Sequence, residues 1–359
     1  RGPALPGPGA RRPACPRPMG GGDGGSAGAT AATLAAGARH SLAVRDDGEV
    51  LAFGRDLFGG CSSVPALPSG RRYVSVAAGA DHSLALRDDG QVLGFGVDGH
   101  RQCRAPPLPA SRRYVAAAAG GAHSLCLRDD GALVAFGLNA EGQCDVPELP
   151  QQRRYVGLAA RAWHSLALRD DGELLAFGRD RDGQCAVPPL PAGRRYAACA
   201  AGGAHSLALR DDGVVVAFGR NRNGQCEVPD LPAGARYTAV AAGGEHSLAL
   251  RSDGQVLCFG ADAFGQCRAP ALARGQAYVQ IAAGDDHSLA LRSDGEVQAF
   301  GGGAQGQCRV PGLPVGRSYA AGRGPPGAEA AGPCLSPRSA QVARDVDELL
   351  RLARTQSAG

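Results

Sequence analysis

Seven histidines and seven cysteines recur at regular spacing and could do chemistry. Imidazole and thiolate both ligate zinc, and the His-Ser pairs near Asp-Asp resemble parts of a catalytic triad. A metal or catalytic site gathers its groups at one place, whereas these residues occur once per copy of a repeat. We therefore expect no metal, cofactor or catalytic residue, and we expect each repeated histidine to hydrogen-bond within its own repeat or to the next. The two sets are His40, His82, His123, His164, His205, His246 and His287, and Cys61, Cys103, Cys144, Cys185, Cys226, Cys267 and Cys308.

The His-Ser pairs mark seven copies of one unit between about Ala29 and Tyr319. One interval between successive histidines is 42 residues and the other five are 41. Self-similarity at this period is typical of repeat architectures, in which each copy is one small structural unit.

Each unit contains the signals of a β-hairpin. In one copy, HSLALR (205–210) precedes Asp-Asp-Gly and the apolar segment VVVAFG (214–219). Asp-Gly between two apolar runs predicts two antiparallel strands, because Gly accepts a positive φ. The segment before the histidine reads as a third strand. A Gln-Cys-x-Val-Pro segment is a candidate fourth strand at the sheet edge, where Pro is tolerated.

The strands carry small or apolar residues on both faces. Leu207 and Leu209 alternate with Ser206 and Ala208, so neither face is strongly polar. Such strands are buried on both sides, and a closed ring of seven units would bury them. The sequence predicts an all-β, seven-bladed β-propeller of about 41-residue repeats over residues 29–321. Residues 29–37 supply the first inner strand, and residues 310–321 are expected to close the ring on the first blade.

The flanking segments lack the repeat. Residues 1–28 are rich in Pro, Gly and Arg and are expected to form a disordered tail. Residues 322–338 read as a linker, and the apolar spacing in 339–354 predicts a short amphipathic helix within a final segment, 339–359. No apolar run is long enough to cross a membrane. The first residue is Arg, so we expect a fragment or a processed product.

Charge and cysteine usage limit the classes of partner and compartment. The formal net charge is only +4, which gives no strong field toward nucleic acid and favours a protein partner. An odd number of cysteines at one repeat position cannot pair completely, so we expect reduced thiols in a reducing compartment, cytoplasmic or nuclear. We expect a monomer.

Two sets of arginines recur with the repeat. One set precedes the Asp-Gly turn and is expected to pair with the adjacent Asp or to cap a neighbour: Arg45, Arg87, Arg128, Arg169, Arg210, Arg251 and Arg292. The other forms pairs at 71–72, 112–113, 153–154 and 194–195 and would make a basic band on connecting loops. Solvated loops are favoured over an anionic partner, since no interleaved aromatics support base stacking.

Recognition should lie where the copies differ, because loops on a rigid scaffold carry binding residues. The five residues before Gln-Cys, or before its equivalent, vary most. Arg161-Ala162-Trp163 is a second departure, at a turn where other copies have Gly, Ala or an acid. Trp163 is the only Trp and is either a contact anchor or a local packing residue. The candidate partner-binding residues are Phe58, His100, Arg101, Arg161, Trp163, Arg181, Arg222 and Phe264.

The consensus AAGxxHSLALRxDGxVxxFGxNxxGQC resembles the repeat of the regulator of chromosome condensation family, which implies a seven-bladed propeller over about 290 residues. Two positions depart from the family pattern: Phe stands where the family usually has Trp, and Cys follows Gln where Leu is usual. The short, uniform copies are similar to bacterial beta-lactamase-inhibiting propellers, and such repeats also occur in HERC-type ubiquitin ligases.

The resemblance implies several functions and does not choose among them. We expect a non-catalytic protein-interaction scaffold rather than an enzyme. A substrate-recognition fragment of a HERC-like ubiquitin ligase and a guanine-nucleotide exchange factor for a small GTPase are the alternatives, so the partner is a protein such as a small GTPase or a ubiquitin-system component. Light sensing needs clustered Trp and is disfavoured, and no segment is long enough for a whole ligase domain.

Overall fold

The computed structural model describes residues 32–56, 59, 61 and 63–321. The predicted tail at 1–28 and the predicted helix at 339–354 therefore lie outside the described residues. In the described part the chain forms seven three-stranded antiparallel sheets. No helix in these ranges has the length and apolarity needed to cross a membrane.

The three strands of each sheet follow one another in sequence and in space. Blades 1 to 7 take their inner, middle and outer strands in this order: β1 (Leu34–Ala36), β2 (His40–Val44), β3 (Val50–Gly54); β4 (Tyr73–Ala78), β5 (His82–Arg87), β6 (Val92–Gly96); β7 (Tyr114–Ala119), β8 (His123–Arg128), β9 (Leu133–Gly137); β10 (Tyr155–Arg161), β11 (His164–Arg169), β12 (Leu174–Gly178); β13 (Tyr196–Ala201), β14 (His205–Arg210), β15 (Val215–Gly219); β16 (Tyr237–Ala242), β17 (His246–Arg251), β18 (Val256–Gly260); β19 (Tyr278–Ala283), β20 (His287–Arg292), β21 (Val297–Gly301).

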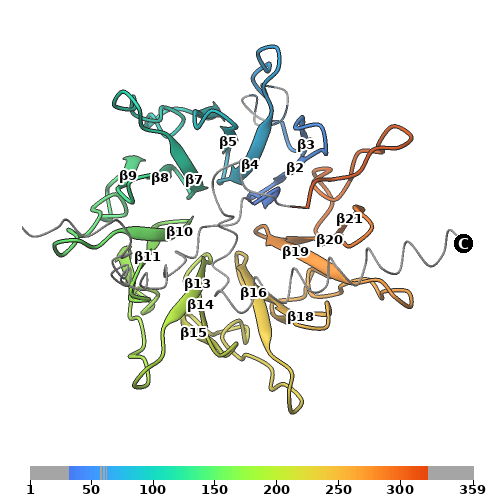
Figure 1. The fold of residues 1–359 in the computed structure, drawn as a ribbon. Coiled ribbons are helices and arrows are strands. Elements are labelled where there is room, and N and C mark those ends of the chain that lie inside the picture. The colour runs from blue at the N-terminus through green and yellow to red at the C-terminus, as the bar shows by residue number, and fades with distance from the viewer. Residues whose placement is uncertain (1–31, 57–58, 60, 62, 322–359) are drawn as a thin grey trace, which may run out of the picture.

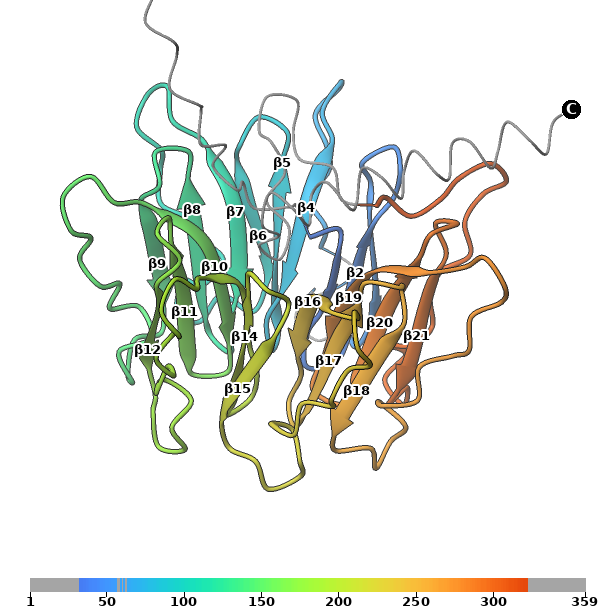
Figure 2. The same cartoon turned by 60° about the horizontal axis from the view of Figure 1, so that its bottom comes forward.

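The seven sheets are arranged around a central axis, with the first strand of each sheet nearest the axis (Figure 1). Viewed from the side, the strands of all blades run between the same two ends of the ring (Figure 2). The predicted seven-bladed β-propeller is confirmed.

The Asp-Gly turns fold as the sequence predicts. In blade 5 the turn glycine, Gly213, has a φ of +84°, a left-handed conformation in which a Cβ would be strained. The amide of Arg210 donates to the carbonyl oxygen of Val214 at 2.8 Å, which closes the hairpin. The turn thus fixes the register of β14 and β15.

The hydrophobic core lies between neighbouring blades. Leu42 and Val50 of blade 1 belong to the same buried cluster as Tyr73, Val76 and Phe95 of blade 2. Each blade therefore buries one face against the blade before it and the other against the blade after it. A single three-stranded sheet could not bury both faces, so the ring is the stable unit.

Ring closure joins the two ends of the described chain. In blades 2 to 7 a Tyr opens the inner strand and pairs with the Arg that ends the middle strand, as Tyr73 pairs with Arg87. Blade 1 has no such Tyr in its own strand, and Tyr319 forms that bridge with Arg45 instead. The amide of Ala320 also donates to the carbonyl oxygen of Val44 at 2.9 Å. The predicted closure of residues 310–321 on the first blade is confirmed, and Tyr319 supplies the missing residue.

The predicted fourth strand is wrong. Each sheet in the described residues has three strands, and the Gln-Cys-x-Val-Pro segments lie outside them. In blade 5 the backbone donors of this segment are satisfied locally: the amide of Cys226 donates to Oδ1 of Asn221 at 2.9 Å, and that of Val228 donates to the carbonyl of Cys226 at 3.1 Å. Pro229 has no amide hydrogen, and its carbonyl accepts from the Tyr237 hydroxyl at 2.7 Å. Few groups remain to extend the sheet.

Candidate functional site

The two ends of the ring carry different kinds of connection. Because His205 pairs with Gly219, the start of the middle strand and the end of the outer strand meet at one end. We call this the turn end: it carries the turns between inner and middle strands and the variable five-residue loops. The opposite, Asp-Gly end carries the hairpin turns and the arginine pairs. Residues that differ between blades are therefore concentrated at the turn end.

The repeated histidines tie neighbouring blades together at the turn end. Nε2 of each lies 2.8–3.0 Å from the hydroxyl of the Ser that follows the next blade's histidine, as between His205 and Ser247. The Ser247 hydroxyl donates to the carbonyl of Gln225 at 2.8 Å, so Nε2 of His205 must carry the hydrogen that it shares with Ser247. Burial lowers the pKa of His205 to about 3, so the ring is neutral at physiological pH.

The repeated cysteines also satisfy local structure. The Cys226 thiol donates to the carbonyl of Arg220 at 3.3 Å, and burial raises the pKa of this thiol to about 11. Over the described ranges, no three His, Cys, Asp or Glu side chains gather in a group that could hold a metal ion.

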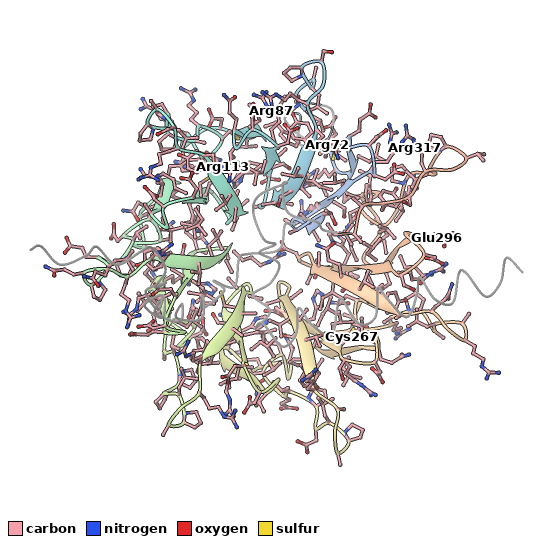
Figure 3. All side chains as sticks on the ribbon, viewed as in Figure 1. Arg72, Arg87, Arg113, Cys267, Glu296 and Arg317 are labelled. Atoms are coloured by element: carbon pink, nitrogen blue, oxygen red, sulfur yellow. The ribbon has the colours of Figure 1, made fainter. Side chains whose placement is uncertain are left out.

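The Asp-Gly end is largely neutralised by its own carboxylates. Each arginine that precedes a turn forms an ion pair with an Asp two residues later, as Arg87 (labelled in Figure 3) does with Asp89 at 2.6 Å. That prediction is confirmed. The first arginine of each predicted pair also lies near a turn carboxylate, and Arg71 is 3.7 Å from Asp88. This end is therefore a mixed-charge surface.

Blade 4 breaks the pattern of the turn end. In the other blades a Gly lies three residues before the histidine, and an ideal Cβ on Gly202 would be 2.3 Å from Cε1 of His205. Blade 4 has Arg161 at this position, and its backbone adopts a different turn that avoids the clash. β10 continues for one more residue, Arg161 pairs with His164, and a two-residue turn follows in which Ala162 has a φ of +43°.

This altered turn interrupts a ring of backbone hydrogen bonds. Neighbouring turns are joined around the axis, for example by the amide of Gly121 donating to the carbonyl of Ala162 at 2.9 Å. Six of the seven junctions have such a bond, and within the described residues none joins the turns of blades 4 and 5. The ring of turns is therefore open where Trp163 meets Gly203.

Arg161 reaches across the axis to the far blades. Its NH1 donates to the carbonyl oxygen of Ala283 in blade 7 at 2.8 Å and to that of Ala36 in blade 1 at 3.3 Å. Its NH2 forms an ion pair with Asp285 at 2.7 Å. The side chain is only 12% exposed, so Arg161 is an internal strap between opposite blades.

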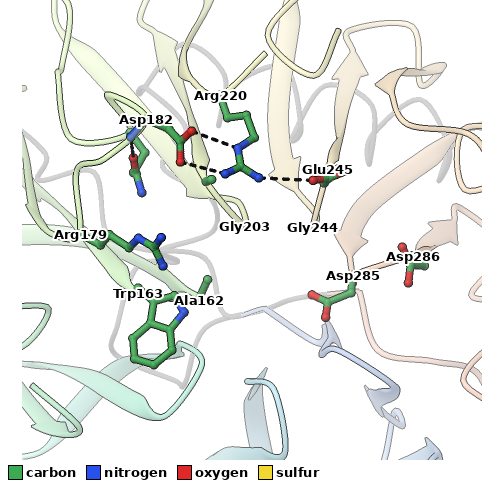
Figure 4. A pocket seen from close by; sticks show the side chains of 12 residues that line it. Ala162, Trp163, Arg179, Asp182, Gly203, Arg220, Gly244, Glu245, Asp285 and Asp286 are labelled. Atoms are coloured by element: carbon green, nitrogen blue, oxygen red, sulfur yellow. Dashed lines mark hydrogen bonds and ion pairs between the residues drawn. The ribbon is translucent and has the colours of Figure 1, made fainter. Parts of the chain in front are cut away.

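A hollow of about 450 Å³ lies beside the open junction. Figure 4 shows Trp163 and Arg179 on one side of it and Asp285 and Asp286 on the other. The side chains and turns of four consecutive blades contribute. Its lining residues are Ala162, Trp163, Arg179, Asp182, Gln184, Gly203, Ala204, Arg220, Gly244, Glu245, Asp285 and Asp286.

Charges in the hollow are partly matched within it. Arg220 holds Asp182 through two hydrogen bonds of 3.1 Å, and its NH1 lies 3.6 Å from Glu245. The hydrogen bond from Arg220 lowers the pKa of Asp182. Burial, together with the charges of Asp285 and Glu245, raises the pKa of Asp286.

The structure places the predicted partner-binding residues in different surroundings. Trp163 is 39% exposed and lines the hollow, whereas Arg161 is the axial strap and is not among the lining residues. Phe58 lies outside the described residues. The other candidates are exposed on turn-end loops and do not line the hollow: His100, Arg101, Arg181, Arg222 and Phe264.

Sequence reasoning missed Arg179, Asp182, Arg220 and most of the acidic wall as members of one site. The available signal was the residue just before each repeated histidine. That position is uncharged in some blades but is Glu245 in blade 6 and Asp286 in blade 7. These acidic residues become part of one site only because the ring places blades 6 and 7 near the altered turn of blade 4.

Comparison with known proteins identifies the repeat. The family model described as "Regulator of chromosome condensation (RCC1) repeat" matches residues 32–59, 73–102, 114–143, 159–184, 198–225, 237–266 and 278–307. The comparison with curated proteins gave no match.

Solved structures share the fold at low sequence identity. Yeast RCC1 (Prp20), solved with Kap60 bound, superposes with a TM-score of 0.64 at 19% identity, covering 94% of this chain and 99% of that chain. Human WBSCR16 gives 0.61 at 19% identity, with 73% and 86% covered. Prp20p from Saccharomyces cerevisiae, described with its binding to Gsp1p and histones, gives 0.58 at 20% identity, with 77% and 86% covered.

Proposed function

Because the chain belongs to the regulator of chromosome condensation (RCC1) repeat family, we propose that it is a non-catalytic protein-binding propeller that binds its partner at the hollow beside Trp163. The observation that carries the proposal is the broken symmetry of the turn end. A scaffold of near-identical blades has one altered turn, and that turn exposes the only Trp of the chain next to a polar hollow.

The surroundings of Trp163 support a role in binding. Trp is enriched at interface hot spots, where a large rigid ring packs into a partner and its polar surroundings set orientation. Trp163 is 39% exposed, whereas Phe177, in the outer strand of the same blade, is 8% exposed. The indole thus leaves substantial apolar surface for a partner to cover.

The first experiment is affinity capture from cell extract with the full chain immobilised. The variant is Trp163→Ala, and the matched control is Phe264→Ala, which removes another exposed aromatic, 61% exposed, from a turn-end loop outside the hollow. We expect a specific partner to bind the wild type and the Phe264→Ala chain and to bind Trp163→Ala at least about 30-fold more weakly. Urea unfolding of each variant checks that the fold is intact.

Other outcomes of the capture would redirect the proposal. If Trp163→Ala retains every specific partner, the hollow is not the binding site. A nucleotide-free small GTPase among the partners would favour the exchange-factor alternative, for which the asymmetric group of Glu245, Asp285 and Asp286 at one end is the supporting feature. Ubiquitin-system components would favour the ligase-fragment alternative.

A further inference from the structure

We propose that the hollow takes one basic side chain, Arg or Lys, from the partner, held between the carboxylates of blade 7 and the indole of Trp163. This inference rests on the proposed function and names the chemistry of its binding site. It follows from which charges in the hollow already have partners and which do not.

The basic groups of the hollow leave one described carboxylate, that of Asp286, without an ion pair. Arg220 is shared between Asp182 and Glu245, and Arg161 is paired with Asp285. Within the described part of the chain, the Asp286 carboxylate forms no hydrogen bond or ion pair, and the positive charges of Arg161 and Arg39 act on it only from beyond ion-pair distance. Two further carboxylates nearby make this wall favourable for an incoming cation.

The aromatic side of the hollow suits the same ligand. A guanidinium or ammonium group is attracted to the face of an indole, and the alkyl stem of the side chain packs on apolar surface. The turns of blades 5 and 6 present Gly203 and Gly244 between the two walls, where large side chains would otherwise fill the space (Figure 4), and Ala204 is a further small lining residue. The hollow therefore has room for an extended side chain.

Arg179 limits the ligand to one cation and sets its direction. Its guanidinium lies next to Trp163 in Figure 4, and among the described residues its side chain forms no ion pair. A second positive group on this side would be repelled, so a polybasic tract fits worse than a single basic residue. The incoming charge is directed toward Asp285 and Asp286.

The only Trp of the chain makes the test direct, because its fluorescence reports on the hollow alone. The probes are three capped tripeptides, acetyl-Gly-Arg-Gly-amide and its Gln and Glu counterparts, titrated at fixed ionic strength. We expect a saturable change in emission with the Arg peptide and weaker binding of the Gln and Glu peptides. Added salt should weaken Arg binding, as for an exposed charge pair.

The diagnostic variant is Asp286→Asn, which keeps the shape of the side chain and removes its charge. The matched control is Asp81→Asn, the equivalent position in blade 2, outside the hollow. We expect Asp286→Asn to raise the Kd of the Arg peptide about 3- to 5-fold and Asp81→Asn to leave it unchanged.

The inference is overturned if the Arg and Gln peptides bind equally, if the Glu peptide binds best, or if the Kd is the same in Asp286→Asn and wild type. Failure here is distinguishable from failure of the proposed function. A partner that is lost with Trp163→Ala but retained with Asp286→Asn would uphold protein binding at the hollow and refute the basic side chain.

Discussion

Each repeated imidazole is held neutral by burial, and its Nε2 atom hydrogen-bonds to a serine of the next blade. Burial lowers the pKa of His82 to about 3 and that of His164 to about 4, from an ordinary value of 6.5. In the unfolded chain these residues take up protons as the pH falls below 6.5, whereas in the folded chain they do not. Acid therefore favours the unfolded chain.

We predict that stability is fully present above pH 6.5 and is lost as the pH falls toward 3–4, where the buried histidines would themselves protonate. Each buried histidine should contribute about 1.4 kcal/mol per pH unit to the loss in free energy of unfolding. Urea unfolding at several pH values between 7.5 and 4.5 measures the slope. Because the pKa of all seven repeated histidines is lowered to about 3 or 4, a slope of only one or two protons near pH 5 would contradict neutral, buried imidazoles.

The repeated cysteine Cys267 has a second thiol, that of Cys258, beside it. Blade 6 has Cys258 where blade 5 has Ala217, and interaction with the Cys258 thiol lowers the pKa of Cys267. The equivalent Cys226 has its pKa raised to about 11 by burial. Cys267 should therefore have more thiolate than its counterparts at mildly alkaline pH.

We predict that iodoacetamide at pH 8 alkylates Cys267 faster than Cys226, because the thiolate is the nucleophile. Cys258→Ala, which restores the residue of blade 5, should remove the difference. Peptide mass spectrometry after short exposures measures both rates. Equal rates in the wild type would contradict the effect of the neighbouring thiol.

Among the structural elements, the altered turn of blade 4 has two consequences from one sequence change. Arg161 cannot occupy the Gly conformation next to His164, so β10 lengthens and the turn shortens to Ala162 and Trp163. The Arg side chain crosses the axis, and the tryptophan is left beside the hollow. The same change thus adds the bonds of Arg161 across the axis and exposes Trp163 at the hollow.

We predict that Arg161→Met lowers the free energy of unfolding by about 1–3 kcal/mol, because the carbonyls of Ala36 and Ala283 lose their donor and Asp285 loses its ion-pair partner. The control is Arg181→Ala, whose exposed pair with Glu141 at 3.3 Å should be worth less than about 1 kcal/mol. Urea unfolding of both variants gives the comparison. Equal effects would show that the strap is not stabilising.

At the scale of the whole molecule, stability depends on closing the ring. Blades 7 and 1 share a buried cluster that contains Leu34, Phe53, Leu289 and Tyr319. Tyr319 is 4% exposed, and its hydroxyl donates to the carbonyl of Pro311 at 2.7 Å. Without this residue blade 1 would have an incomplete inner strand and an uncovered face.

We predict that the closing residues 317–321 stabilise the ring, and a chain ending at residue 321 is the reference for this test. A chain ending at residue 316 should lose at least about 3 kcal/mol, because the buried Tyr319 ring and the closing backbone bonds are gone. Tyr319→Phe isolates the hydroxyl and should cost only about 1 kcal/mol. If the 316 chain is as stable as the 321 chain, closure does not hold the ring together.

The sequence by itself determined the blade, because a blade is built from local signals repeated seven times. Asp-Gly fixed each hairpin, such as that of β14 and β15, and the spacing of His40 to His287 fixed the number of blades. The predicted fourth strand is absent from the described sheets because backbone groups of the Gln-Cys-x-Val-Pro segment hydrogen-bond within their own loop, as the amide of Cys226 does. The residue pattern does not show that these loop bonds replace pairing with the sheet.

Only the tertiary structure decided the site. Arg161 was singled out in the sequence, but its bond to Asp285 joins residues 124 apart in the chain, and no local pattern specifies that contact. The hollow combines Trp163, Arg220, Glu245 and Asp286 from four blades, so it exists only once the ring is closed. The local signals are the same in each blade and therefore produce a symmetric ring. The site, by contrast, is formed by residues that differ between blades and that only the closed ring brings together.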